Sequence, residues 1–250
     1  MTLAKQPLTQ HLLELKKRLM RCLLAFAAAT IFCYFFAADI YAFLVAPLAA
    51  AFGDAGDRRM IYTSLTEAFF TYLRLAMFAG FILSFPVIAL ELYRFLSPGL
   101  YAREKRAMIP YLVAAPALFL GGAAFVYYLV FPAAWRFFLG FETIGGDGSL
   151  PIQLEAKVAD YLILSLHLII AFGLSFQLPV VLVLLVRSGM MRLETLKEGR
   201  RYAIVGIVTL AAFITPPDIF SQIALSVPLY VLYELAIVFC GNNIRHREEP

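Results

Sequence analysis

The stretch FLSPGLYAREKR, from Phe95 to Arg106, is a short polar segment between two long apolar runs. Pro98 cannot continue a helix and Gly99 readily adopts a positive φ, so the chain is expected to turn here. Three cations and one carboxylate, Glu104, then occupy four consecutive positions. The segment is either a loop whose basic residues hold the topology or a docking surface in which Glu104 meets a cationic ligand.

Apolar residues dominate the whole chain: 62% of its 250 residues are hydrophobic and 15% are charged. A soluble domain usually has about 45–50% apolar and about 25% charged residues. This excess predicts an all-α polytopic membrane protein, with residues 1–250 forming one integral domain. The three cysteines, Cys22, Cys33 and Cys240, lie in or beside apolar runs and are interpreted as small apolar side chains rather than a disulfide or metal site.

Six apolar runs are candidates for membrane spans, each of which needs about 20 helical residues. The predicted spans are residues 19–38, 68–92, 109–131, 159–186, 202–216 and 220–240. The last two are short, since Thr215-Pro216-Pro217-Asp218 ends the fifth run abruptly, and we interpret them as a tight helical pair. Kinks are predicted where prolines interrupt four of the spans, at Pro86, Pro116, Pro179 and Pro228.

The N-terminal 18 residues are largely polar, and the leucines at positions 8, 12 and 15 have a helical spacing that Leu19 continues. Such spacing lines one face of a helix. A cytoplasmic amphipathic helix over residues 1–18 is therefore expected on the membrane surface, leading directly into the first span. That span is too long for a signal-peptide core, so we expect it to be retained. Residues 241–250 form a polar tail.

Lys and Arg are distributed very unevenly between the two sides of the predicted bundle. Sixteen of the 21 lie before the first span, in the second-to-third and fourth-to-fifth connections, or in the tail, and four lie on the other side. The positive-inside rule then places both termini in the cytoplasm. Arg74 remains inside the second span, where it can snorkel to the interface. Glu91, at the inner end of that span, is expected to pair with Arg94.

On the outer side, Ile40–Phe52 is expected to lie along the interface as a short helix, although Pro47 interrupts it. Gly121-Gly122 and Gly206 are candidates for close helix approach. Aromatic residues after the third span look like an interfacial belt, namely Trp135, Phe137, Phe138 and Phe141.

No motif in the sequence indicates covalent catalysis, so we expect no catalytic residues, cofactor, bound metal or nucleic-acid partner. The chain has no His-Glu-x-x-His, no G-x-S-x-G elbow and no Gly-rich phosphate loop before a helix. A small-solute secondary transporter is the alternative function, in which Arg74, Gln177 and Glu234 would line a substrate path. The two halves show no inverted repeat with matching broken segments, which counts against it.

Several stretches occur in a specific order between the six runs. They are HLLELKKRL (11–19), APL (46–48), FLSPGLY (95–101), EKR (104–106), FP (131–132), FGLSFQLP (172–179) and TPPD (215–218) followed by SQ (221–222). Together these stretches resemble the TatC family, the multi-spanning component of the twin-arginine protein translocase. The resemblance covers nearly the whole chain, about residues 7–240.

The resemblance implies a receptor and scaffold in the bacterial inner membrane that binds paired-arginine signal peptides of folded proteins. Partners would be the single-span subunits TatB and TatA and membrane lipid, in an oligomeric complex whose transport draws on the proton-motive force. The implied signal-peptide site comprises Glu14, Lys16, Arg18, Phe95, Pro98, Tyr101 and Glu104. The implied assembly positions are Pro47, Gln177 and Asp218. Several family members have glutamate where this chain has Gln177, which can hydrogen-bond a partner helix but cannot ionise.

The chemistry of the implied ligand agrees with two carboxylates in this site. A guanidinium offers planar, bidentate donors that match a carboxylate. Two adjacent arginines require two such acids, and Glu14 and Glu104 are available on the predicted cytoplasmic side. The simpler alternatives are an i,i+4 pair between Glu14 and Arg18, and local pairing of Glu104 with Arg103 or Lys105.

Overall fold

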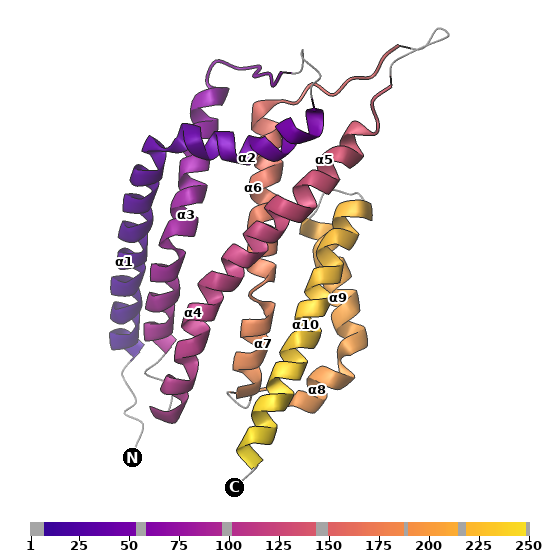
Figure 1. The fold of residues 1–250 in the computed structure, drawn as a ribbon. Helices are drawn as coiled ribbons and strands as arrows, with labels where there is room; N and C mark the ends of the chain where they lie inside the picture. The colour runs from indigo at the N-terminus through magenta and orange to yellow at the C-terminus, as the bar shows by residue number, and fades with distance from the viewer. Residues whose placement is uncertain are drawn as a thin grey trace. The chain divides into compact units, whose positions relative to one another are not determined.

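The computed structural model describes residues 8–53, 59–96, 102–143, 150–187, 190–214 and 219–248. The described part of the chain is mainly helical, with two isolated β-bridges and no strand, which confirms the all-α prediction. The elements are α1 (Leu8–Phe35), α2 (Ala37–Phe52), α3 (Glu67–Leu96), α4 (Ala102–Phe125), the π-helical turn η2 (Val126–Val130), α5 (Phe131–Leu139), α6 (Val158–Ser175), α7 (Leu178–Arg187), α8 (Leu193–Glu198), α9 (Arg200–Ile214) and α10 (Ile219–Glu248) (Figure 1).

Five helical segments among the described residues are long and apolar enough to cross a membrane. They are Leu12–Phe35, Glu67–Phe95, Leu112–Leu139, Val158–Arg187 and Gln222–Gly241, and they match the first four predicted spans and the sixth. The fifth predicted span is α9, whose 15 residues confirm that it is short. The sixth continues as a helix to Glu248, beyond its apolar part. The predicted turns at Ser97–Gly99 and Thr215–Asp218 lie outside the described residues.

The chain divides into two compact units. The first contains α1, residues 72–96 of α3 and residues 102–116 of α4; the second contains residues 42–71 and everything from residue 117 onward. The predicted single integral domain, with its cytoplasmic N-terminal segment and tail, stays a prediction.

Close backbone contact joins α1 to α3 in the first unit. A Cβ atom built on Gly80 would lie 2.5 Å from Thr30 Oγ1 and 2.7 Å from Thr30 Cα. Only glycine leaves room for the α1 backbone at this distance, because a side chain here would overlap main-chain atoms. The pairing of these two helices therefore depends on a glycine that the sequence analysis did not single out.

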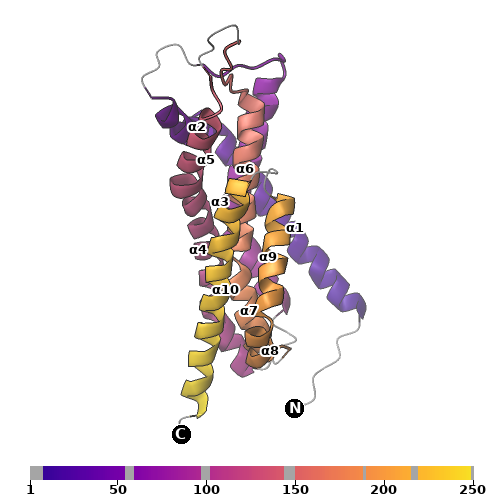
Figure 2. The ribbon, with the colours of Figure 1, turned by 90° about the vertical axis from the view of Figure 1, so that its right-hand side faces the viewer.

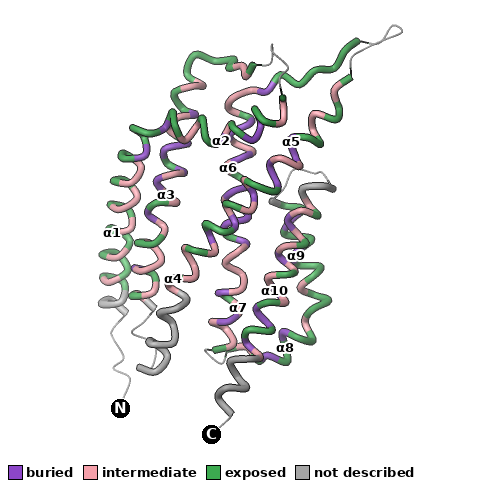
Figure 3. The backbone as a smooth tube through the Cα atoms, in the orientation of Figure 1, coloured by how far each residue is buried: buried purple, intermediate pink, exposed green. Residues whose placement is uncertain are grey.

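The leucine face of α1 points away from the protein. Leu12, Leu15 and Leu19 are 63%, 43% and 65% exposed, and exposed residues dominate this helix in Figure 3. In a membrane, exposed leucines meet lipid at no hydrophobic cost. The opposite face carries Glu14 and Arg18, which are partly covered by α3. The predicted amphipathic stripe is present, and it continues into the first span without a break in the helix.

A second glycine contact joins α4 to α6 in the second unit. A Cβ on Gly122 would lie 2.8 Å from the carbonyl oxygen of Phe172, and one on Gly173 would lie 2.7 Å from the Phe119 ring. Gly122 therefore fulfils the predicted role in close helix approach. Gly121 and Gly206 do not, because a Cβ on either would meet nothing within 4 Å.

The fourth predicted span is broken at Pro179. The helix ends at Ser175, two turn residues follow, and α7 begins at Leu178. Proline removes a helical hydrogen bond and clashes with the preceding turn, which explains the break. At Pro86, Pro116 and Pro228 the helices α3, α4 and α10 continue through the proline.

The aromatic residues on and after α5 form the predicted interfacial belt only in part. Phe137 and Phe141 are 41% and 63% exposed, as an interfacial belt requires, but Trp135 is only 4% exposed. Its ring packs 5.4 Å from that of Phe131 and 5.1 Å from that of Tyr161. Assigning Trp135 to the belt was therefore wrong: the helix turns it toward α6, where it joins the core.

The α2 helix is present as predicted and runs through Pro47 without interruption. In the second unit it lies across the beginning of α6 (Figure 1). The Tyr127 hydroxyl donates to the carbonyl oxygen of Phe43 at 2.9 Å, and the Tyr161 hydroxyl donates to that of Leu44 at 2.6 Å. These two hydrogen bonds attach α2 to η2 and α6.

Candidate functional site

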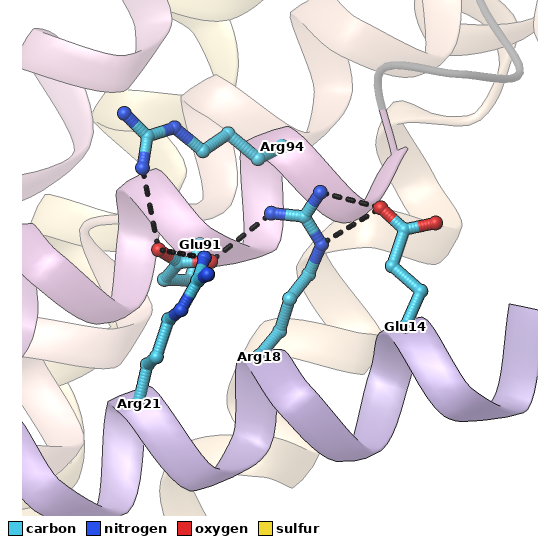
Figure 4. Close-up of polar contacts among 5 residues, drawn as sticks. All are labelled: Glu14, Arg18, Arg21, Glu91 and Arg94. Carbon is cyan, nitrogen blue, oxygen red and sulfur yellow. Dashed lines mark hydrogen bonds and ion pairs between the residues drawn. The ribbon is translucent and has the colours of Figure 1, made fainter.

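Five charged side chains meet where the beginning of α1 packs against the end of α3 (Figure 4). Glu14, Arg18 and Arg21 come from α1, at spacings of four and three residues that place them on one face. Glu91 and Arg94 come from the last two turns of α3. Helix packing in the first unit therefore concentrates three cations and two carboxylates at one end of the α1–α3 pair.

The Arg18 guanidinium lies between the two carboxylates. Its Nε and Nη2 atoms donate to Oε1 of Glu14, with the Nε bond at 3.0 Å, and its Nη1 atom donates to Oε2 of Glu91 at 3.0 Å. The side chain of Arg18 is 17% exposed and that of Glu14 is 27% exposed. The i,i+4 pair that the sequence offered as the simpler role of Glu14 thus exists, but it is one part of a larger network.

Glu91 is the most buried member of this network, with a side chain 6% exposed. The predicted pair with Arg94 is confirmed at 3.3 Å, and Arg21 lies 3.6 Å from the same oxygen. A buried carboxylate is stable only when it is paired and hydrogen-bonded, and these three arginines supply that compensation. Sequence reasoning placed Glu91 with its neighbour on α3 and missed its two partners on α1, because the contact with Arg18 joins residues 73 positions apart.

The other implied signal-peptide residues fall in three groups. Lys16 is exposed on α1, and Phe95, half-buried, lies one turn beyond Glu91 on α3. Glu104 falls in the first turn of α4, but its side chain is not among those that the structure describes. Pro98 and Tyr101 lie outside the described residues. The structure therefore brings together Glu14, Arg18 and the end of α3, and the role of the whole set stays a prediction.

Two of the three implied assembly residues can be located. Pro47 is buried inside α2, so its side chain is covered by this chain itself. Gln177 is half-buried at the break between α6 and α7, where its Nε2 atom donates to the carbonyl oxygen of Gly173 at 3.4 Å. Asp218 lies outside the described residues.

A separate polar cluster joins α8, α9 and α10 in the second unit. Arg200 donates to both oxygens of Glu234, at 2.7 and 3.0 Å, and the Tyr230 hydroxyl donates to Oε1 at 3.0 Å. The hydrogen bonds to Glu234 raise the pKa of Arg200 above its ordinary value. Tyr233 donates to the carbonyl oxygen of Leu196 at 2.6 Å. Glu234 is thus paired with Arg200 and Tyr230 within its own unit.

Comparisons with known proteins agree with the resemblance seen in the sequence. Residues 10–228 match the family model described as Sec-independent protein translocase protein (TatC). The chain is 49% identical over 232 residues to the Sec-independent protein translocase protein TatC of Rickettsia prowazekii (strain Madrid E), covering 93% of this chain and 91% of that protein. It is 38% identical over 247 residues to the protein of the same name from Escherichia coli (strain K12), covering 98% and 93%.

A solved structure has the same fold. The crystal structure of the twin arginine translocase receptor TatC superposes with a TM-score of 0.75 and 35% sequence identity, covering 93% of this chain and 98% of that one. A second crystal structure of the receptor, in DDM, gives a TM-score of 0.77 at 34% identity, covering 92% and 98%. Since the family model and these relatives cover nearly the whole chain, the protein belongs to the TatC family of Sec-independent protein translocase proteins.

Proposed function

We propose that this chain is the receptor subunit of a twin-arginine translocase and binds the paired arginines of signal peptides with Glu14 and Glu104. The observation that carries the proposal is the state of Glu14 at the start of α1. Its Oε1 atom already accepts a guanidinium, that of Arg18, while its Oε2 atom has no hydrogen-bond partner among the described residues. Figure 4 shows this second oxygen directed away from Arg18.

The contact between Glu14 and Arg18 indicates how a peptide arginine would bind. A carboxylate has about four lone-pair sites and can accept donors from two guanidinium groups. One arginine of the peptide would bind the outer oxygen of Glu14, and the adjacent one would bind Glu104. Lys16, Phe95, Pro98 and Tyr101 would surround the rest of the peptide.

Chain geometry supports placing Glu104 near Glu14. Glu91 contacts Arg18 and lies five residues before Leu96, the last residue of α3. The connection from Leu96 to Ala102 cannot exceed about 20 Å even when fully extended. The first turn of α4, which contains Glu104, therefore starts within that distance of Leu96, the end of α3.

The cytoplasmic orientation of this site is part of the proposal. Both termini would lie in the cytoplasm, in agreement with the positive-inside rule. The site would then face the side of the membrane on which signal peptides are present before export. Export of the folded cargo would draw on the proton-motive force, and the chain itself would act in transport rather than as a catalyst.

Site-specific photo-crosslinking tests the peptide site. A photoreactive residue replacing Phe95 is expected to crosslink a synthetic paired-arginine signal peptide, because Phe95 lies one turn beyond Glu91 on α3. A paired-lysine peptide should give much less product, since Lys cannot make the bidentate contact. The matched control carries the photoreactive residue at Met190, an exposed apolar position beside α8. Equal crosslinking from Met190 and Phe95 would contradict the proposed site.

The partner surface of this proposal is the exposed apolar face of α9 together with the break at Gln177. On α9, Tyr202, Val205 and Phe213 are 69%, 65% and 87% exposed, and α9 and α10 lie side by side (Figures 1 and 2). A helix of 15 residues is shorter than the bilayer core, so it thins the bilayer locally or pairs with another helix. The partners proposed here are the single-span subunits TatB and TatA, in an oligomeric complex with lipid.

Cysteine crosslinking tests the partner surface. Cysteine at Val205 is expected to form crosslinks with a cysteine in the span of TatB or TatA. Cysteine at Leu24 of α1, an apolar position that is 63% exposed and meets lipid in the same way, serves as the control and should form few. Crosslinks of equal yield from Leu24, or none from Val205 in a complex that transports cargo, would remove α9 as the partner site.

A further inference from the structure

The two oxygens of Glu91 have different partners. Oε2 accepts from Arg18 at 3.0 Å, whereas Oε1 lies 3.3 Å from Arg94 and 3.6 Å from Arg21. Arg94 and Arg21 are 52% and 62% exposed and can exchange their contacts with water. Arg18 is 17% exposed and is held between two acids. Of the three arginines, Arg18 is therefore the one whose position depends most on its contact with Glu91.

The contact between Arg18 and Glu91 decides how many carboxylate oxygens of Glu14 can accept a hydrogen bond from a ligand. A guanidinium can bind one carboxylate through two parallel N–H···O bonds, using both oxygens. In this structure Nη1 of Arg18 donates to Glu91, and its other two nitrogen atoms, Nε and Nη2, both donate to a single oxygen of Glu14 (Figure 4). Without an acceptor at position 91, nothing described here would prevent Arg18 from binding both oxygens of Glu14.

We propose that Glu91 is a positioning residue for signal-peptide binding: it holds one edge of Arg18, so that one oxygen of Glu14 stays open to a peptide guanidinium. The inference rests on the proposed role of Glu14. Arg18 carries the same charge as the ligand and lies within reach of the same acid, so it is a permanent local competitor. Glu91 divides the hydrogen bonds of that competitor between two carboxylates.

A double-mutant cycle between Glu91 and Glu14 tests this inference. Glu91→Gln keeps the size of the side chain but removes its charge. In vesicles containing the full chain, affinity for a synthetic paired-arginine signal peptide should fall about tenfold, the size expected when one hydrogen bond to a charged group is lost. In a Glu14→Gln background the same change should lower affinity by less than about twofold, because Glu91 acts only through Glu14.

The cycle separates positioning from two simpler effects. Loss of folding, or loss of one negative charge near a cationic peptide, would weaken binding by the same factor in both backgrounds. An equal factor in the two backgrounds, or no effect of Glu91→Gln on the unmodified chain, would therefore overturn the inference. If Glu14→Gln alone leaves affinity unchanged, the proposed peptide site fails instead, so the two failures are distinguishable.

A second variant covers the case in which Glu91→Gln does not fold. Arg18→Lys retains a cation beside Glu91 but cannot bridge two carboxylates with a planar fork. Because the lysine ammonium cannot occupy both oxygens of Glu14, Arg18→Lys should change peptide affinity less than about threefold, and Glu91→Gln added to Arg18→Lys should lower affinity by less than about twofold further. The control is Arg94→Gln, which removes a half-exposed contact to the other oxygen of Glu91 and should change affinity less than about threefold. A tenfold loss with Arg94→Gln, or with Arg18→Lys alone, would contradict the assignment, as would a tenfold effect of Glu91→Gln that persists in the Arg18→Lys background.

Discussion

A chain carrying both Glu14→Gln and Glu104→Gln should bind a paired-arginine signal peptide about a hundredfold more weakly than the unmodified chain. Each substitution removes a carboxylate from a guanidinium contact, and a hydrogen bond to a charged group contributes about 1.5–3 kcal/mol. Two such losses correspond to at least a factor of about 100 in the dissociation constant. Titration of a labelled peptide into vesicles containing each variant measures the effect.

The control for this experiment changes two carboxylates elsewhere by the same chemistry. Glu194 and Glu198 are exposed on α8, which the positive-inside rule predicts to be cytoplasmic. Glu194→Gln with Glu198→Gln alters the net charge identically, so it should weaken binding only by the general electrostatic effect. If the two double variants lose affinity equally, the paired acids have no specific role.

The second large effect is expected from Gly80→Ala. A methyl group here would lie 2.5–2.7 Å from side-chain and main-chain atoms of Thr30, so α1 must move away from α3. Overpacking of this kind typically costs about 1–3 kcal/mol. We therefore expect a lower thermal unfolding temperature for the purified protein in detergent. We also expect weaker peptide binding, because the same helix contact brings Arg18 to Glu91.

Gly206→Ala is the matched control, since it adds the same methyl group to a helix in open space. It should not destabilise the protein, because alanine favours a helix over glycine by about 0.5–1 kcal/mol. Equal destabilisation by both variants would show that the loss of stability at position 80 does not come from the contact with Thr30.

The sequence predicted only part of the contacts at the proposed peptide site. The resemblance to the TatC family implied Glu14, Arg18 and Phe95, and the i,i+4 pair of Glu14 with Arg18 follows directly from helix geometry. Glu91 could be paired only with its neighbour Arg94. Its contact with Arg18 depends on two helices meeting at a particular register, and no local pattern in either helix contains that register.

Local sequence determined the spans, because the free energy of placing a segment in a membrane depends on its own residues. It also determined the short α9 and the outward leucine face of α1, whereas the four prolines in the predicted spans did not by themselves show which one would break its helix. Tertiary structure alone decided that Trp135 is buried against Tyr161 and that Gly80 lies against Thr30. It also placed Arg18 between Glu14 and Glu91. Each of these depends on which helices pack together, and packing joins residues far apart in the chain.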